Sequence, residues 1–185
     1  MSIFDKFKNL FSTVDGVETP LPALFATRHD TIYAPISGML VSREEIDDEV
    51  IAAGMLGEGY GILPVGNVIY APANGRIDMT TVTNHSIGLI TPTGAKVIIH
   101  VGLGTVKMEG KGFARYAEMG DTVTAGQPLL SFDAEAIKAA ECEDIVTVVV
   151  SNAAALNGVE LSGSSNTLLG GRPLVKVGDP LIVTK

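Results

Sequence analysis

The chain has 185 residues, of which 46% are hydrophobic, so it is long and apolar enough for one domain with a sizeable core. Its formal net charge of −8 argues against nucleic acid as the main ligand, because phosphate contacts need a basic surface, and favours a partner with a basic face. The single cysteine, Cys142, excludes a disulfide framework and a cysteine-rich zinc site.

Targeting and membrane-spanning signals are missing from the sequence. It contains no run of about 18 apolar residues, which a transmembrane helix would need. Asp5, Lys6 and Lys8 interrupt any apolar stretch of a signal peptide. We therefore expect a cytoplasmic protein.

Residues 1–12 are predicted to form a short amphipathic helix. Its apolar residues recur at helical spacing, and charged residues occupy the other face; the apolar stripe consists of Ile3, Phe4, Phe7, Leu10 and Phe11. Such a helix can bind the surface of a membrane, although it could also pack against its own domain. Residues 13–30 contain Pro20 and Pro22 and have no periodicity, so we expect a linker there.

From Thr31 onwards the pattern is typical of β-structure, and residues 31–185 are predicted to form one domain. Short runs of Val, Ile and Thr alternate with glycine and proline turns. Ile-Tyr-Ala-Pro-Ile-Ser-Gly at 32–38 is echoed at 69–75, and the run at 119–130 is echoed at 177–182. This pattern predicts an all-β antiparallel sandwich of the barrel-sandwich hybrid type, with short helices at 112–118 and 134–140.

Two of the three histidines, His85 and His100, mark a candidate site. His100 lies within a run of β-branched residues at 96–101 and precedes Gly102 and Gly104, where a backbone can approach a ligand closely. Imidazole titrates near neutral pH and serves as nucleophile, acid or base. The alternative for either histidine is ordinary packing in a core.

Several motifs, taken together, resemble the glucose-type IIA component of the bacterial phosphoenolpyruvate-dependent sugar phosphotransferase system, in its stand-alone form. They occur in the family's order over residues 31–185: Ala-Pro-Ile-Ser-Gly (34–38), Gly-Glu-Gly-Tyr-Gly-Ile (57–62), Tyr-Ala-Pro-Ala-Asn-Gly (70–75), Thr-Asn-His (83–85), His-Val-Gly-Leu-Gly-Thr-Val (100–106), Gly-Lys-Gly-Phe (110–113) and Val-Val-Ser-Asn (149–152).

This resemblance implies a phosphotransferase component that works through a phosphohistidine and needs no cofactor. His100 matches the phosphoryl acceptor, His85 the histidine that hydrogen-bonds the phosphoryl group, and Thr83 the residue that orients His85. The implied partners are the histidine phosphocarrier protein, which donates the phosphoryl group, and the sugar-specific IIB and IIC components. Cys142 lies among acids that would repel a phosphoryl group, so we do not expect it to accept one.

The sequence departs from the family pattern at Gly104, where many members carry an acid beside the histidines. We expect weaker docking of a basic partner as a result. Asp48 best matches the family's other flanking acid, while Asp47 and Glu49 stay open because the register of this acidic run is ambiguous. The expected apolar surface for partners consists of Ile51, Ile98, Val101 and Val106.

Two other classes of protein use related β-scaffolds. A lysostaphin-like zinc hydrolase needs a His-x-His pair, but Ile98 and Gly102 stand two residues from His100. We expect no metal in the chain alone, although His85 and His100 could form half of a zinc site with a partner's carboxylate. A swinging-arm carrier domain is suggested by residues 120–129, but its Met-Lys pair is missing: Lys107 and Met108 stand in reverse order.

Overall fold

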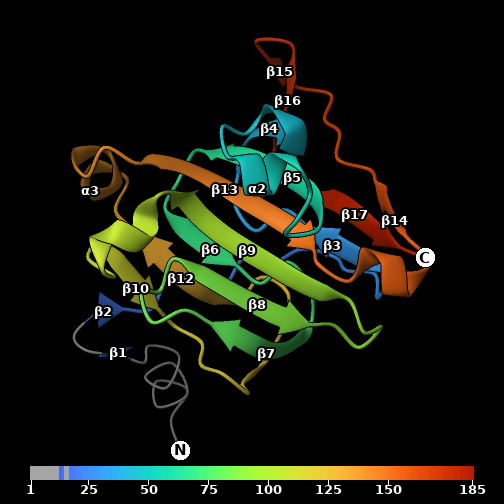
Figure 1. Ribbon diagram of the computed structural model, residues 1–185. Coiled ribbons are helices and arrows are strands. Elements are labelled where there is room, and N and C mark those ends of the chain that lie inside the picture. Colours follow the sequence, from blue (N-terminus) through green and yellow to red (C-terminus); the bar gives the residue numbers. More distant parts are fainter. Residues whose placement is uncertain (1–12, 15–16) are drawn as a thin grey trace, which may run out of the picture.

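A computed structural model describes residues 13–14 and 17–185, and a large antiparallel sheet dominates it (Figure 1). The sheet has nine strands. In spatial order they are β11 (Thr122–Val123), β7 (Gly75–Thr80), β8 (Ser86–Ile90), β9 (Lys96–Leu103), β13 (Glu143–Val150), β5 (Glu58–Pro64), β4 (Gly38–Ser42), β16 (Arg172–Val175) and β15 (Leu168–Leu169).

Two smaller sheets form the opposing layer. One contains β10 (Phe113–Arg115), β12 (Pro128–Phe132) and β6 (Val68–Tyr70), and the other contains β14 (Val159–Leu161), β17 (Pro180–Thr184) and β3 (Thr31–Tyr33). Every strand pair in the described residues is antiparallel. The predicted all-β antiparallel sandwich is thus confirmed.

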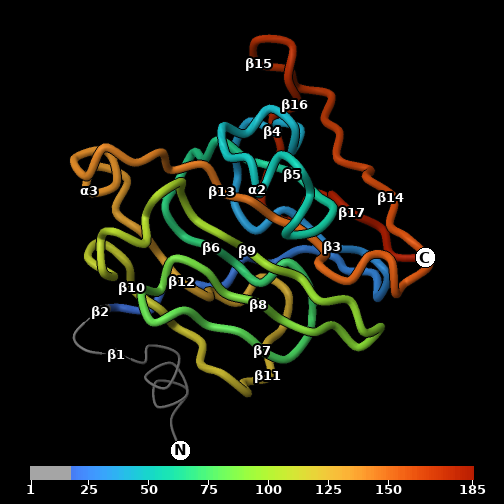
Figure 2. The backbone as a smooth tube through the Cα atoms, in the orientation of Figure 1, coloured from blue at the N-terminus to red at the C-terminus, as the bar shows by residue number. Residues whose placement is uncertain are grey.

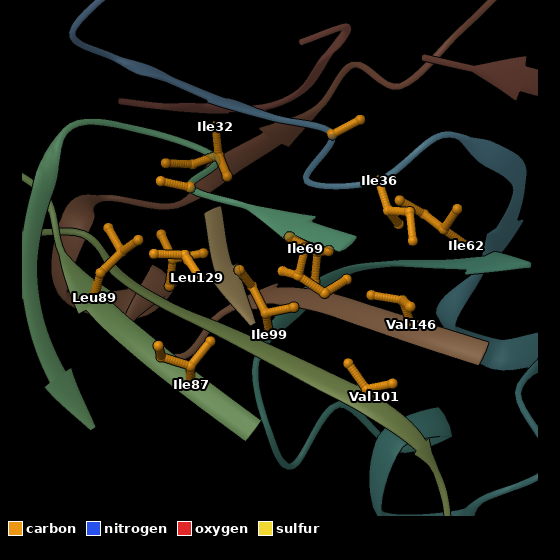
Figure 3. Close-up of a cluster of buried hydrophobic side chains, with 14 of the residues drawn as sticks. Ile32, Ile36, Ile62, Ile69, Ile87, Leu89, Ile99, Val101, Leu129 and Val146 are labelled. Atoms are coloured by element: carbon orange, nitrogen blue, oxygen red, sulfur yellow. The ribbon is translucent and has the colours of Figure 1, made fainter. Parts of the chain in front are cut away.

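The hydrophobic core fills the space between these layers. Figure 3 shows Ile87 of β8 and Ile99 of β9 facing Ile69 of β6 and Leu129 of β12. All four side chains are fully buried. Alternation along β9 sends Val97, Ile99 and Val101 into this core and leaves His100 on the outer face of the sheet.

The repeated sequence motifs join the two small sheets through matched hydrogen bonds. The Tyr33 N–H donates to the Pro72 carbonyl and the Tyr70 N–H to the Pro35 carbonyl, each at 2.8 Å. The second repeat forms equivalent hydrogen bonds: the Gly126 N–H donates to the Ala71 carbonyl, and the Gly178 N–H donates to the Ala34 carbonyl. The two echoes noticed in the sequence are therefore equivalent structural units.

Short helices are confined to connections between the strands. In the described residues they are η1 (Arg43–Glu45), α2 (Glu49–Ala52), η2 (Thr105–Met108), α3 (Ala134–Ala139) and η3 (Ala153–Leu156). The helix predicted at 134–140 is confirmed. The one predicted at 112–118 is wrong, because Phe113–Arg115 pairs with β12 as a strand.

The amphipathic helix predicted for residues 1–12 lies outside the described residues. The segment expected to be a linker is less irregular than predicted, since β1 (Thr13–Val14) pairs with β2 (Val17–Glu18). Further along, Phe25 contacts the Tyr33 ring at a centroid distance of 5.3 Å. Among the described residues, the helices are too short and too polar to cross a membrane. Figure 2 shows the hairpin of β15 and β16 projecting from the body of the protein.

Candidate functional site

A tight turn before β8 fixes the position of His85. The Thr81 hydroxyl accepts a hydrogen bond from the Ser86 N–H at 3.1 Å and donates to the Ser86 carbonyl at 3.2 Å. Asn84 adopts a left-handed conformation with φ of 55°, which asparagine tolerates better than most residues. Inside this turn, Thr83 Oγ1 lies 2.6 Å from His85 Nδ1. The turn thereby orients the imidazole before the strand begins.

Arg115 clamps the same turn, which the sequence gave no reason to expect. Its Nη1 donates to the Thr81 carbonyl at 3.1 Å and also to the Asn84 side-chain oxygen. Glu118 holds the other guanidinium nitrogen at 2.8 Å. Arg115 follows Gly-Lys-Gly-Phe in a segment predicted to be helical, and its contacts span about thirty residues of sequence. A local pattern carries no signal for such a contact.

Strand pairing places His100 beside His85. In the ladder between β8 and β9, His100 is directly opposite Ser86, and the Val101 N–H donates to the His85 carbonyl at 2.8 Å. The two ring centroids are 4.9 Å apart and the rings are nearly perpendicular, at 88°. A group bound to one imidazole therefore reaches the other. The structure brings together the two predicted histidines and Thr83.

Gly102 ends the regular part of β9 and has to be glycine. Its φ is +81°, and a Cβ atom there would lie 2.3 Å from Thr105 Cγ2 and 2.7 Å from the Glu143 carbonyl oxygen. The Thr105 hydroxyl donates to the Val101 carbonyl at 2.7 Å and stabilises the turn. This geometry brings the Gly102 carbonyl within hydrogen-bonding contact of the His100 side chain.

Both imidazoles are held neutral at physiological pH. Burial lowers the pKa of His85, which is only 7% exposed. Burial and the neighbouring His85 together lower the pKa of His100 to about 4, while the Gly102 carbonyl and Asp48 act in the opposite direction. At pH 7, His100 is therefore an uncharged imidazole with one free lone pair.

Asp48 is the member of the acidic run that lies near the histidines. It caps α2, and its Oδ1 accepts hydrogen bonds from Val50 N at 2.9 Å and Ile51 N at 3.0 Å. It also contributes to the electrostatic environment of His100. Asp47 and Glu49 are exposed and have no such effect on His100. The structure therefore favours Asp48 among the three candidates.

The expected apolar partner surface needs a correction. Ile51 is 3% exposed and Val101 is fully buried, because each packs into a hydrophobic cluster, so neither side chain is available to a partner. Ile98 is partly exposed on the same face of β9 as His100, and Val106 of η2 is 61% exposed. Val50 of α2 and Val82 of the turn are also exposed, and the sequence interpretation had missed them.

Gly104 lies at the exposed rim of the site. It adopts a left-handed conformation with φ of 73° immediately before η2. A Cβ atom at this position would meet only the Cys142 Sγ at 3.8 Å, so there is room for a side chain. No acid therefore stands at this rim position to match Asp48.

Metal ligands are sparse around the two histidines. Among the described residues, no group of three or more His, Cys, Asp or Glu side chains could hold a metal ion. Cys142 is partly buried and its Sγ contacts the Ala140 carbonyl at 3.7 Å. Two imidazoles alone are half of a tetrahedral zinc site.

The lowered pKa of His100 makes folding stability depend on pH. Its folded pKa of about 4 is below the ordinary value of 6.5, so the unfolded state binds more protons between these values. Stability should be constant above about pH 6.5 and fall as the pH drops from there toward 4. Urea unfolding of His100→Gln across this range should show a shallower fall than the wild type.

The matched control for this measurement is the exposed His29, whose substitution by Gln should leave the fall in stability as in the wild type. An equally steep fall in His100→Gln would contradict the assignment of the pH dependence to His100.

Comparison with known proteins identifies the family of this chain. The family model described as phosphoenolpyruvate-dependent sugar phosphotransferase system, EIIA 1, matches residues 30–156. The chain is 36% identical over 151 residues to the PTS system glucose-specific EIIA component of Bacillus anthracis, covering 82% of this chain and 92% of that protein.

Two further similarities extend the comparison. The chain is 37% identical over 142 residues to the PTS system beta-glucoside-specific EIIBCA component of Bacillus subtilis, covering 77% of this chain but only 23% of that longer protein. The structure resembles glucose permease IIA from Mycoplasma capricolum with a TM-score of 0.68 and 27% identity, covering 84% of this chain and 95% of that one. These matches do not support a zinc hydrolase or a swinging-arm carrier.

Proposed function

The chain belongs to the EIIA 1 family of the phosphoenolpyruvate-dependent sugar phosphotransferase system, and we propose that His100 is the residue on which it carries the phosphoryl group. As a family member, the protein carries phosphoryl groups between components of this system. The observation that supports the assignment to His100 is its neutral, partly exposed imidazole, 4.9 Å from a second imidazole that is almost fully buried.

The histidine phosphocarrier protein is the proposed donor, and a IIB domain is the proposed acceptor. In the first transfer, the free lone pair of His100 forms a new N–P bond while the N–P bond of the donor breaks. The electron pair of the broken bond stays on the donor nitrogen. The proton on the other ring nitrogen of His100 stays hydrogen-bonded to the Gly102 carbonyl, so no proton needs to move. Such in-line transfer depends mainly on positioning.

His85 and Thr83 are proposed to hold the transferred group. If the Thr83 hydroxyl donates to Nδ1 of His85, the other ring nitrogen carries the proton and can donate to a phosphoryl oxygen. The phosphoryl group adds close to two negative charges, which an imidazole N–H can stabilise in a partly buried site. Thr83 therefore acts by selecting the tautomer of His85.

The proposed docking surface combines exposed apolar side chains with an acidic rim. Ile98, Val106, Val50 and Val82 supply the apolar part, and Asp48 lies at the edge near His100. Such a surface suits a partner with a basic, apolar face, because complementary charge speeds the encounter and apolar contact stabilises the complex.

Substituting the two histidines one at a time should separate uptake of the phosphoryl group from its transfer to a IIB domain. His100→Gln should abolish incorporation of labelled phosphate from the phosphorylated histidine phosphocarrier, because the nucleophile is gone. His85→Gln should still accept phosphate but pass it to a IIB domain roughly a hundredfold more slowly, because a hydrogen-bond donor to the phosphoryl group is lost. Incorporation of acid-labile phosphate by His100→Gln would show that the acceptor is a different residue.

An acid at position 104 should strengthen docking. The left-handed conformation of Gly104 is one that aspartate tolerates, and the space there is open. Gly104→Asp should therefore increase the association rate with the phosphocarrier several-fold at low salt, and added salt should erase the gain. Stopped-flow transfer kinetics at two ionic strengths would measure this.

Gly94 provides the matched control for this charge change. It is an exposed glycine with φ of +85° and open space around it, at the other end of β8 and β9. Gly94→Asp adds the same charge away from the histidines and should leave the rate unchanged. Equal acceleration by both variants would assign the effect to net charge alone.

Residues 1–12 are proposed to bind the inner face of the membrane, which would keep a cytoplasmic carrier near its transporter. In the full chain, Phe7→Ser combined with Phe11→Ser should weaken cosedimentation with anionic vesicles at least roughly tenfold, because two aromatic side chains proposed to insert into the membrane are lost. Leu24→Ser is the control, since Leu24 is 95% exposed but outside the stripe. Unchanged binding by the double variant would refute this proposal.

A further inference from the structure

Thr147 on β13 lies directly opposite His100. In the antiparallel ladder between β13 and β9, these two residues are register partners, so their side chains project from the same face of the sheet. On its other side, Thr147 is paired with Gly61 of β5, which has no side chain. The position thus places a hydroxyl group next to the proposed phosphoryl acceptor.

The hydroxyl of Thr147 is buried without a hydrogen-bond partner. The residue is 1% exposed. Within the described part of the chain, only one other buried side-chain polar atom, the Ser162 Oγ, has no partner. Buried polar groups are almost always hydrogen-bonded, because leaving one unpaired costs the desolvation of that group. An unpaired hydroxyl at this position therefore calls for an explanation.

The surroundings of Thr147 leave His100 as its one polar neighbour along the ladders. Next to His100 on the same face are Ile98 and Gly102, and next to Gly61 are Gly59 and Leu63. Along β13 itself, Ile145 and Val149 flank Thr147 on this face and are buried. Along these ladders, the side chains next to Thr147 are apolar or absent, except for the imidazole.

We propose that Thr147 binds the transferred group, because its O–H donates a hydrogen bond to a phosphoryl oxygen when His100 is phosphorylated. This inference rests on the proposed function of His100. Phosphorylation brings three acceptor oxygens to a site where the resting hydroxyl has no hydrogen-bond partner. The unpaired hydroxyl raises the free energy of the resting form, and pairing relieves it in the phosphorylated form. Thr147 therefore shifts the transfer equilibrium toward the phosphorylated protein.

The test compares variants that differ only in the hydroxyl. Thr147→Val keeps the shape of the side chain and removes the O–H, while Thr147→Ser keeps the O–H. The phosphorylated histidine phosphocarrier, present in known amount, serves as donor. The readouts are the equilibrium ratio of the two phosphoproteins, the ³¹P chemical shift of the phosphohistidine, and the melting temperature of the unphosphorylated protein.

Thr147→Val should shift the equilibrium roughly tenfold toward the unphosphorylated form and move the ³¹P signal, because a hydrogen bond to a charged group is lost. Its melting temperature should equal or exceed that of the wild type, since an unpaired buried group is removed. Thr147→Ser should retain the wild-type equilibrium. Ser162→Ala removes the other unpaired hydroxyl and should change neither the equilibrium nor the ³¹P signal.

A wild-type equilibrium and ³¹P signal in Thr147→Val would overturn the inference, as would a Thr147→Ser variant that behaves like Thr147→Val. Failure of the wild-type chain to take up phosphate would instead overturn the proposed function. Thr147→Ala provides a second variant without the hydroxyl, should Thr147→Val fold poorly, and the same shift in equilibrium is expected of it.

Discussion

The pairing of β8 with β9 is the constraint on which the site depends. It brings the His85 carbonyl to the Val101 N–H and sets the two imidazoles 4.9 Å apart at nearly a right angle. A slip of one residue would turn His100 into the core and Ile99 outward. The turn held by Arg115 and the required glycine at 102 lie at the same end of this ladder, beside the two histidines.

The position of His100 in this ladder also sets its protonation state and the charges around it. Partial burial keeps His100 neutral, so the proposed nucleophile has no proton to lose before it reacts. The described residues show no cluster able to hold a metal there, and Asp48 adds negative charge nearby. In the proposed mechanism, the N–H of His85 would meet part of the negative charge of the phosphoryl group. A carrier benefits from this balance, since a strongly bound phosphoryl group would not be passed on.

Much of this could be predicted from the sequence, but only where the signal is local. Alternating apolar residues and paired turn motifs define the strands, and the imidazoles within them mark the site. The misassigned segment at 112–118 is rich in glycine, and its strand exists only through pairing with β12. Ile51 and Val101 are predicted to be exposed because they match positions of the family's partner surface. Such a match does not show whether the side chain is buried, and both are. Arg115 and Thr147 meet the site across long stretches of chain, which a local pattern does not encode.

The internal repeat shows how the fold separates stability from function. The two Tyr-Ala-Pro units exchange equivalent hydrogen bonds, so both units contribute alike to joining the two small sheets. His85, in contrast, lies in the turn before β8, and His100 lies on the neighbouring strand β9. The acid that acts on His100 comes from the segment around α2. The outer faces of β8, β9 and β13 point away from the repeated core. Exchanges at Gly104 or Thr147 should therefore alter transfer more than folding.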